Sequence, residues 1–148
     1  MKQNEKMVEL DIDTLGHYLD RALNVLIKRL NSVFKERGID LQHAQFIILK
    51  VLYCCDGLSQ RELAFQLGKD PAAVCRAVKY LENKGYVEQR PVNGTTNHVF
   101  LTERAKEIRP DIDGIADEIT SLGLNGLDDE QIKNGIIFLN QIYHSAKP

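Results

Sequence analysis

Residues 59–102 read SQRELAFQLGKDPAAVCRAVKYLENKGYVEQRPVNGTTNHVFLT, and this stretch predicts a helix, a tight turn, a second helix and a hairpin. Ser59 and Glu62 have the spacing of a capping box, in which two reciprocal hydrogen bonds close the N-terminus of a helix. Gly68 ends that helix. Asp70, which a proline follows, is a favourable start for the next helix. The short connection between the two helices predicts the sharp corner of a helix-turn-helix.

The second helix of this stretch is predicted over residues 70–84, and a hairpin follows it. Four apolar side chains recur at helical spacing on its buried side: Val74, Ala77, Val78 and Leu81. Gly85 closes the helix. Strand signals at residues 86–90 and 97–101 enclose residues 91–96, in which an Asn-Gly pair favours a tight hairpin turn. The stretch therefore predicts a winged helix-turn-helix.

Long helices are predicted on both sides of this stretch. Before it, apolar residues recur at steps of three or four, at Ile12, Leu15, Leu19, Ala22, Leu26, Leu30 and Val33. A second helix runs over about residues 42–53. After the stretch, a helix capped by Thr102 ends near Gly123, and Asp128 or Asp129 caps a last helix. Its apolar stripe is Ile132, Ile136, Leu139 and Tyr143. The predicted fold class is mainly α with a small β wing.

The composition is that of an ordinary globular protein, with 148 residues and a net charge of −2. No apolar run approaches the roughly 18–20 residues that span a bilayer. Residues 1–13 lack the apolar core of a secretory signal, so we expect a cytoplasmic protein that does not bind membranes. The three cysteines, two of them adjacent, do not suit a disulfide framework. Residues 59–104 hold seven basic and five acidic residues, and this local excess of positive charge favours a nucleic-acid partner.

Three segments of the chain resemble the MarR family of winged-helix transcriptional regulators: residues 58–68, 74–76 and 81–88. The helices on either side also match that family in order and length. The resemblance therefore extends over nearly the whole chain, which we interpret as a single domain of residues 1–148.

The resemblance implies a division of this domain into two parts. Residues 42–102 would be the winged helix that binds double-stranded DNA, and residues 10–37 and 104–146 would be the helical dimerisation part. A two-fold homodimer presents its two reading heads to the half-sites of a palindromic operator. In the family, repression is the commoner mode of regulation, and a small phenolic or aromatic effector often controls it.

A helix that begins at Asp70 can enter the major groove of DNA by its N-terminal end. With its apolar side inward, this helix exposes Ala72, Ala73, Arg76 and Lys79. Arg76 can form two hydrogen bonds with guanine, and Lys79 can neutralise a phosphate. Ser59 and Arg61 could meet the DNA backbone through N–H groups and charge. The alternative interpretation is that these charges are only the solvated side of a helix.

The stretch departs from the family at the reading helix and at the wing. Ala72, Ala73 and Cys75 stand where such helices usually carry Ser or Thr, whose hydroxyls bond phosphates and bases. The wing, residues 91–98, is shorter than is usual and contains no Arg or Lys. Hydrogen-bond donors remain at Asn93, Thr95 and Thr96, and Arg90 at the base of the wing is the nearest cation. We therefore expect weaker or less salt-dependent DNA binding than in relatives.

Effector and redox sites follow from the resemblance as further hypotheses. The candidate effector pocket would be lined by His17, Tyr18, Arg21, Tyr53 and Cys54. Alternatively, each of these residues is ordinary packing or surface. Cys75 lies beside Arg76, whose charge could lower the pKa of the thiol, so a thiol-based redox sensor is a second hypothesis. The alternative for the cysteines is that they are small apolar side chains.

Other classes of protein are less favoured by the sequence. We find no phosphate-binding loop, no nucleophile motif and no cysteine–histidine spacing typical of zinc, so we expect no enzyme, cofactor or metal site. An anti-repressor or other protein-interaction module, which kept the fold and lost DNA binding, remains an alternative because the wing is uncharged.

Overall fold

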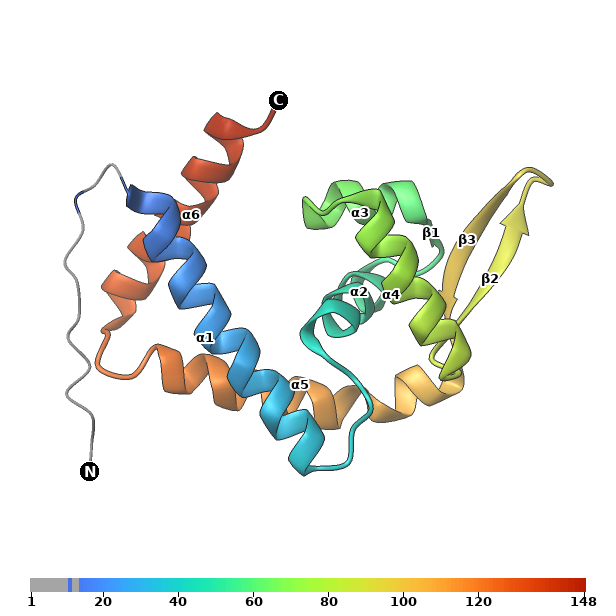
Figure 1. Ribbon diagram of the computed structural model, residues 1–148, viewed down its shortest axis with the longest axis horizontal. Helices are drawn as coiled ribbons and strands as arrows, with labels where there is room; N and C mark the ends of the chain where they lie inside the picture. Colours follow the sequence, from blue (N-terminus) through green and yellow to red (C-terminus); the bar gives the residue numbers. More distant parts are fainter. Residues whose placement is uncertain (1–10, 12–13) are drawn as a thin grey trace.

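The structure is a computed structural model, and it describes Asp11 and residues 14–148 (Figure 1). Its elements are α1 (Leu15–Glu36), α2 (His43–Cys54), β1 (Leu58–Ser59), α3 (Gln60–Leu67), α4 (Pro71–Asn83), β2 (Val87–Val92), β3 (Thr96–Leu101), α5 (Glu103–Gly123) and α6 (Asp129–Ala146). The predicted fold class is confirmed, since a winged helix-turn-helix lies between long helices. Ile12, the first position of the predicted apolar stripe, lies outside the described residues.

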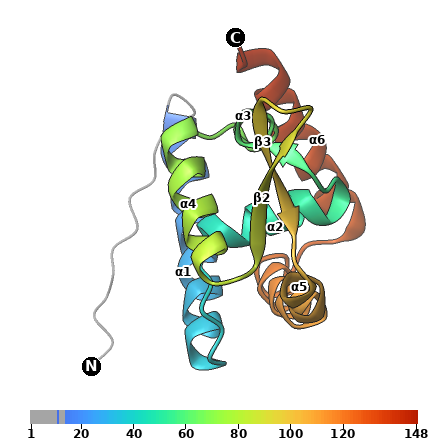
Figure 2. The same ribbon diagram turned by 90° about the vertical axis from the view of Figure 1, so that its right-hand side faces the viewer.

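The head of the molecule consists of α2, α3, α4 and a three-stranded antiparallel sheet in the order β1-β3-β2. All four residues that were predicted to be buried on the second helix of the motif are buried in α4. They share one core with Leu49, Leu63 and Val99, which are fully buried. Figure 2 shows α4 along one side of the head, with the β2–β3 hairpin beside it. The buried side of α4 thus holds its opposite side toward solvent.

The helix starts follow the predicted chemistry in three of four cases. The Ser59 hydroxyl accepts a hydrogen bond from the Glu62 backbone N–H at 3.1 Å, and the Glu62 carboxylate accepts one from the Ser59 N–H at 2.7 Å. The hydrogen bond from the Ser59 backbone N–H to the carboxylate, and the nearby Ser59 hydroxyl, lower the pKa of Glu62. At the start of α5 the Thr102 hydroxyl accepts a hydrogen bond from the Ala105 N–H, and at the start of α6 Asp128 and Gln131 form a second capping box. Asp70 stands at the predicted N-cap of α4, but its side chain makes no capping hydrogen bond.

The hairpin extends further than the sequence predicts. β2 continues to Val92 and β3 begins at Thr96, so the wing narrows to a loop of residues 93–95. Asn93 and Gly94 both have positive φ, 54° and 81°, as the Asn-Gly signal requires. The proline at position 91 is tolerated within β2 because this strand lies at the edge of the sheet. β1, which pairs with β3, was not predicted.

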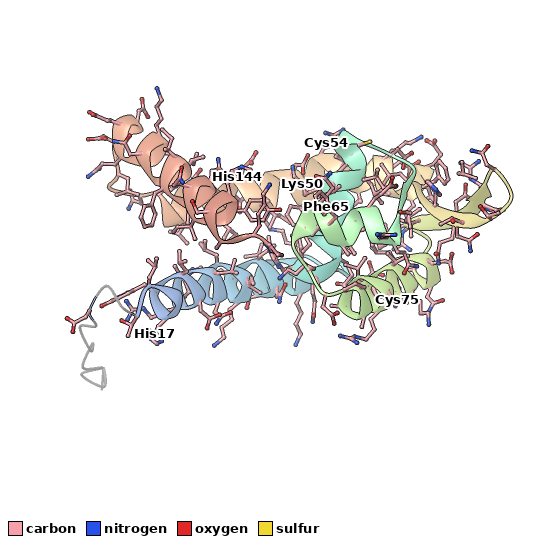
Figure 3. The ribbon with its side chains drawn as sticks, turned by 90° about the horizontal axis from the view of Figure 1, so that it is seen from above. His17, Lys50, Cys54, Phe65, Cys75 and His144 are labelled. Atoms are coloured by element: carbon pink, nitrogen blue, oxygen red, sulfur yellow. The ribbon has the colours of Figure 1, made fainter. Side chains whose placement is uncertain are left out.

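The flanking helices form the other half of the molecule. α1 packs against α5, and α5 buries Ile112, Ile115 and Ile119, which recur at helical spacing. In contrast, α6 contains no buried residue, and its large apolar side chains are exposed: Ile136, Ile137, Phe138, Leu139 and Tyr143. Figures 2 and 3 show α6 apart from α1, and the Tyr143 ring of α6 lies near Gly68 at the end of α3. None of the helices in the described residues is both long and apolar enough to span a bilayer.

Candidate nucleic-acid interface

The exposed side of α4 carries two cations. Arg76 and Lys79 are exposed, and neither has a hydrogen-bond or ion-pair partner among the described residues. They are one helical turn apart, so they share one side of the helix. Ala72 is exposed and Ala73 half-buried near the N-terminus of α4, where small side chains let a ligand approach the backbone closely. The side of α4 that was predicted to read DNA is therefore exposed to solvent.

The start of α3 carries the predicted residues Ser59 and Arg61. Ser59 is buried, with 8% of its surface exposed, and both its hydroxyl and its N–H are engaged by Glu62. The Ser59 N–H is thus occupied by the cap, whereas its hydroxyl, which only accepts there, keeps a proton to donate; its predicted contact with the DNA backbone stays a prediction. Arg61 is exposed and has no partner among the described residues. Phe65, on the same helix, is 72% exposed.

The wing presents polar groups at its tip and a single cation at its base. Asn93, Thr95 and Thr96 are all exposed. The Arg90 guanidinium lies over the Phe100 ring, 3.9 Å from its centre, and its Nε is 3.4 Å from the Glu88 carboxylate. Arg90 is thus held in place while 58% of its side chain stays exposed, but Glu88 offsets part of its charge.

The residues of the predicted effector pocket do not come together in this chain. Figure 3 shows His17 at the outer end of α1 and Cys54 on the head, far apart. Near His17, the Arg21 guanidinium lies 5.2 Å from the centre of the Tyr18 ring. The Tyr53 hydroxyl instead donates a hydrogen bond to a backbone carbonyl of α5. Burial and a nearby aspartate raise the pKa of Tyr53 to about 12.

A cavity of about 330 Å³ lies elsewhere, between α1, α2 and α4. Its lining residues are Ile27, Asn31, Gln42, His43, Ala44, Ile47, Ile48, Leu67, Lys69, Ala73, Val74 and Ala77. The Asn31 side chain accepts a hydrogen bond from the His43 backbone N–H at 2.7 Å, which joins the two helices. Burial and the nearby Lys69 charge lower the pKa of His43. Sequence reasoning missed this site, although Ile27, an apolar residue outside the predicted stripe, is a signal for it.

The cysteines are all reduced thiols. Cys54 and Cys55 are exposed, and Cys75 is half-buried on α4. Figure 3 shows Cys54 and Cys75 on opposite sides of the head, so these two cannot form a disulfide in this arrangement. Within the part of the chain that the structure describes, no three histidine, cysteine or acidic residues are grouped as metal ligands would be.

A family model, a curated protein and solved structures all relate this chain to transcriptional regulators. The family model described as the MarR family matches residues 39–95. The HTH-type transcriptional regulator YybA of Bacillus subtilis (strain 168) is 26% identical over 115 residues, which cover 75% of this chain and 77% of that protein.

Two solved structures share the fold over most of their length. A MarR transcriptional regulator from Methanosarcina mazei Go1 has a TM-score of 0.81 and 26% identity, and the match covers 92% of this chain and 91% of the other. A mutant MarR from E.coli, solved in complex with operator DNA, has a TM-score of 0.78 and 22% identity. That match covers 88% of this chain and 94% of the other.

Proposed function

We propose that this chain is a transcriptional regulator of the MarR type, that it binds a palindromic DNA operator as a homodimer and that it represses the neighbouring genes. Residues 42–102 then read the DNA, and residues 10–37 and 104–146 hold the dimer together. A small aromatic or phenolic molecule releases the repression.

One observation carries the DNA-binding part of the proposal. α4 is held in the core by one side, and on its other side Arg76 and Lys79 are exposed without partners among the described residues. An α-helix fits the major groove, where an Arg can bond both acceptors of a guanine and a Lys can contact phosphate. The fold also matches the E.coli MarR that was solved with operator DNA. α4 with these two cations is therefore the reading helix.

The exposed side of α6 supports the homodimer. Ile136, Leu139 and Tyr143 lie on one helical stripe, and they are 56%, 51% and 45% exposed. A contiguous apolar surface of this kind usually marks a contact with another protein. A second copy of the chain supplies an identical apolar stripe, so a two-fold contact buries both at once.

The cavity between α1 and α4 supports control by a small ligand. Its volume of about 330 Å³ is within the range of small-molecule sites, and most of its lining is apolar. His43 and Lys69 add polar groups that can bind a phenolic oxygen or a carboxylate. Because Ala73 and Ala77 of α4 line the same cavity, a bound ligand contacts the reading helix directly.

Selection of bound fragments from genomic DNA tests the DNA-binding proposal. The purified protein should enrich fragments that share a palindrome, with half-site centres about 34–36 Å or a multiple of that distance apart. Failure to enrich any sequence would contradict the proposal and would favour the protein-interaction module.

A cavity-filling variant tests the ligand proposal separately. Ile27 lines the cavity from α1, on the side away from the reading helix. Ile27→Trp should keep operator binding and lose the release of DNA by phenolic acids. Tyr18→Phe, which alters a residue of the pocket that the sequence suggested, serves as the control and should respond as the wild type does. Release that persists in Ile27→Trp would place the effector elsewhere.

A further inference from the structure

Four side chains meet where the head joins the flanking helices, and we call them the Asp40 network: Asp40, Tyr80, Tyr86 and Arg104. Asp40 lies in the connection between α1 and α2. Its carboxylate accepts hydrogen bonds from the Tyr86 hydroxyl at 2.5 Å and from Arg104 Nη2 at 3.5 Å. Its backbone carbonyl accepts a third from the Tyr80 hydroxyl at 2.7 Å.

Arg104 completes the network. Its Nη2 donates to the Tyr86 hydroxyl oxygen at 3.2 Å, and its Nη1 donates to the backbone carbonyl of Lys84 at the end of α4. The guanidinium also lies over the Tyr86 ring, 4.2 Å from its centre. One cation therefore contacts the end of α4, the residue before β2 and the connection after α1.

The charges of the network fix which group donates and which accepts. Partial burial acts to raise the pKa of Asp40, but the Tyr86 hydrogen bond and the Arg104 charge outweigh it, so the pKa is lowered. Burial and the bond to Asp40 raise the pKa of Tyr86 to about 12. At neutral pH the carboxylate is charged and the phenol keeps its proton.

The position of the network in the fold gives it a mechanical role. The chain joins the head to the flanking helices at two places, the connection after α1 and the step from β3 into α5 at Thr102. Asp40 lies on the first junction, and Arg104 lies just after the second. Figure 1 shows the end of α4 beside the start of α5. The network thus ties both junctions to the end of the reading helix.

We propose that Asp40 is a positioning residue for DNA recognition. It fixes the orientation of α4 relative to the dimer helices, and it thereby sets the spacing between half-sites that the dimer accepts. This inference rests on the proposed function. The side chains of Asp40 and Arg104 are 36% and 50% exposed, whereas the Tyr86 ring is buried in the core. The charged pair can therefore be altered while the core stays intact.

The test is a set of binding titrations on DNA duplexes with altered half-site spacing, and on a duplex with one half-site. One inserted base pair turns the second half-site by about 35° and moves it by about 3.4 Å. The wild type should lose about tenfold in affinity at such a duplex, because its two DNA-binding heads cannot both reach their half-sites. Asp40→Asn should lose only about twofold there and should bind the single half-site as the wild type does.

Tyr86→Phe keeps the buried ring and removes only the hydroxyl that Asp40 binds. It should relax the spacing preference in the same direction, and the double variant should relax it no further than Asp40→Asn alone. Asp111→Asn is the matched control, since Asp111 is an exposed acid near the same junction with no partner among the described residues. It should keep the wild-type spacing profile.

Two results would overturn the inference. One is a wild-type spacing profile in Asp40→Asn and Tyr86→Phe. The other is an equal loss on every duplex, including the single half-site, which would indicate damage to the head itself. If Asp40→Asn does not fold, Tyr86→Phe decides between these results. Failure of the wild type to bind any DNA would instead refute the proposed function.

Discussion

At the scale of single residues, His43 links the ligand cavity to protein stability. Its side chain is half-buried in the cavity, and burial together with the Lys69 charge lowers its pKa in the folded protein. The unfolded chain therefore binds a proton more readily than the folded chain does. By linkage, the free energy of unfolding decreases as the pH falls below the ordinary histidine value of about 6.5.

We expect His43→Gln to weaken this dependence on pH. Glutamine cannot take up a proton, so the variant should lose less stability than the wild type between about pH 7.5 and about pH 5.5. Chemical denaturation of both proteins at a series of pH values measures the difference. An equally steep loss in both proteins would show that His43 does not contribute.

The role of a residue is predicted best from the sequence when it depends on residues a few positions away. The capping roles of Ser59 and Glu62 depend on groups within three positions, and the predicted bonds are present. The roles of Asp40 and Arg104 depend on a contact across 64 positions, which no spacing along the chain reveals.

At the scale of elements, helices were predicted more accurately than strands. Each of the six helices in the described residues has apolar side chains at helical spacing and polar or glycine residues near its ends, so its bounds differ little from those expected. β1 has two residues and no period, and it exists because β3 lies beside it. The predicted hairpin was shorter because residues 91–96 were all placed in the turn, whereas an edge strand tolerates the proline at position 91.

The wing gives a prediction at this scale. Its tip, residues 93–95, carries no charge, so it cannot add an ionic contact in the minor groove. Thr95→Lys should increase affinity for DNA and should steepen the dependence of log K on log salt by about 0.9. Titration at several salt concentrations measures that slope. Lys133 lies on α6, and Thr95→Lys should therefore be compared with Lys133→Ala, which should leave the slope unchanged.

An unchanged slope in Thr95→Lys would contradict the placement of the wing against DNA. A slope that changed in Lys133→Ala would show that charge anywhere on the protein matters, and it would remove the special role of the wing.

At the scale of the whole molecule, α6 determines the oligomeric state in this account. Leu139→Glu places a charge within the exposed apolar stripe and removes a side chain whose full burial contributes about 1.5–3 kcal/mol. In a two-fold dimer this loss occurs twice, so the variant should be a monomer of 16.8 kDa. Sedimentation equilibrium measures the mass.

Asn134→Glu is the control for this prediction, because Asn134 lies on the opposite side of α6 from the stripe. It should remain a dimer. A wild type that sediments as a monomer, or a Leu139→Glu variant that remains dimeric, would contradict the assignment of α6 to the dimer contact.

The packing of the helices creates a ligand cavity that the sequence did not predict. The ligand cavity forms because α1 lies beside α2 and α4, and residues of four helices and of the two connections at Gln42 and Lys69 line it. The pocket suggested by the resemblance combined residues that are not neighbours in this chain, since His17 and Cys54 lie far apart (Figure 3). Element order and helix bounds follow from local pattern, whereas cavities and junctions follow from packing angles that the pattern does not encode.

The central claim is that α4 reads DNA through Arg76, and one titration tests it most directly. Wild type, Arg76→Ala and Lys79→Ala are measured on the selected operator and on a scrambled duplex. Arg76→Ala should lose about 1–3 kcal/mol of discrimination between the two, which is about 5- to 150-fold, while Lys79→Ala should weaken both alike. Wild-type discrimination in Arg76→Ala would contradict the claim.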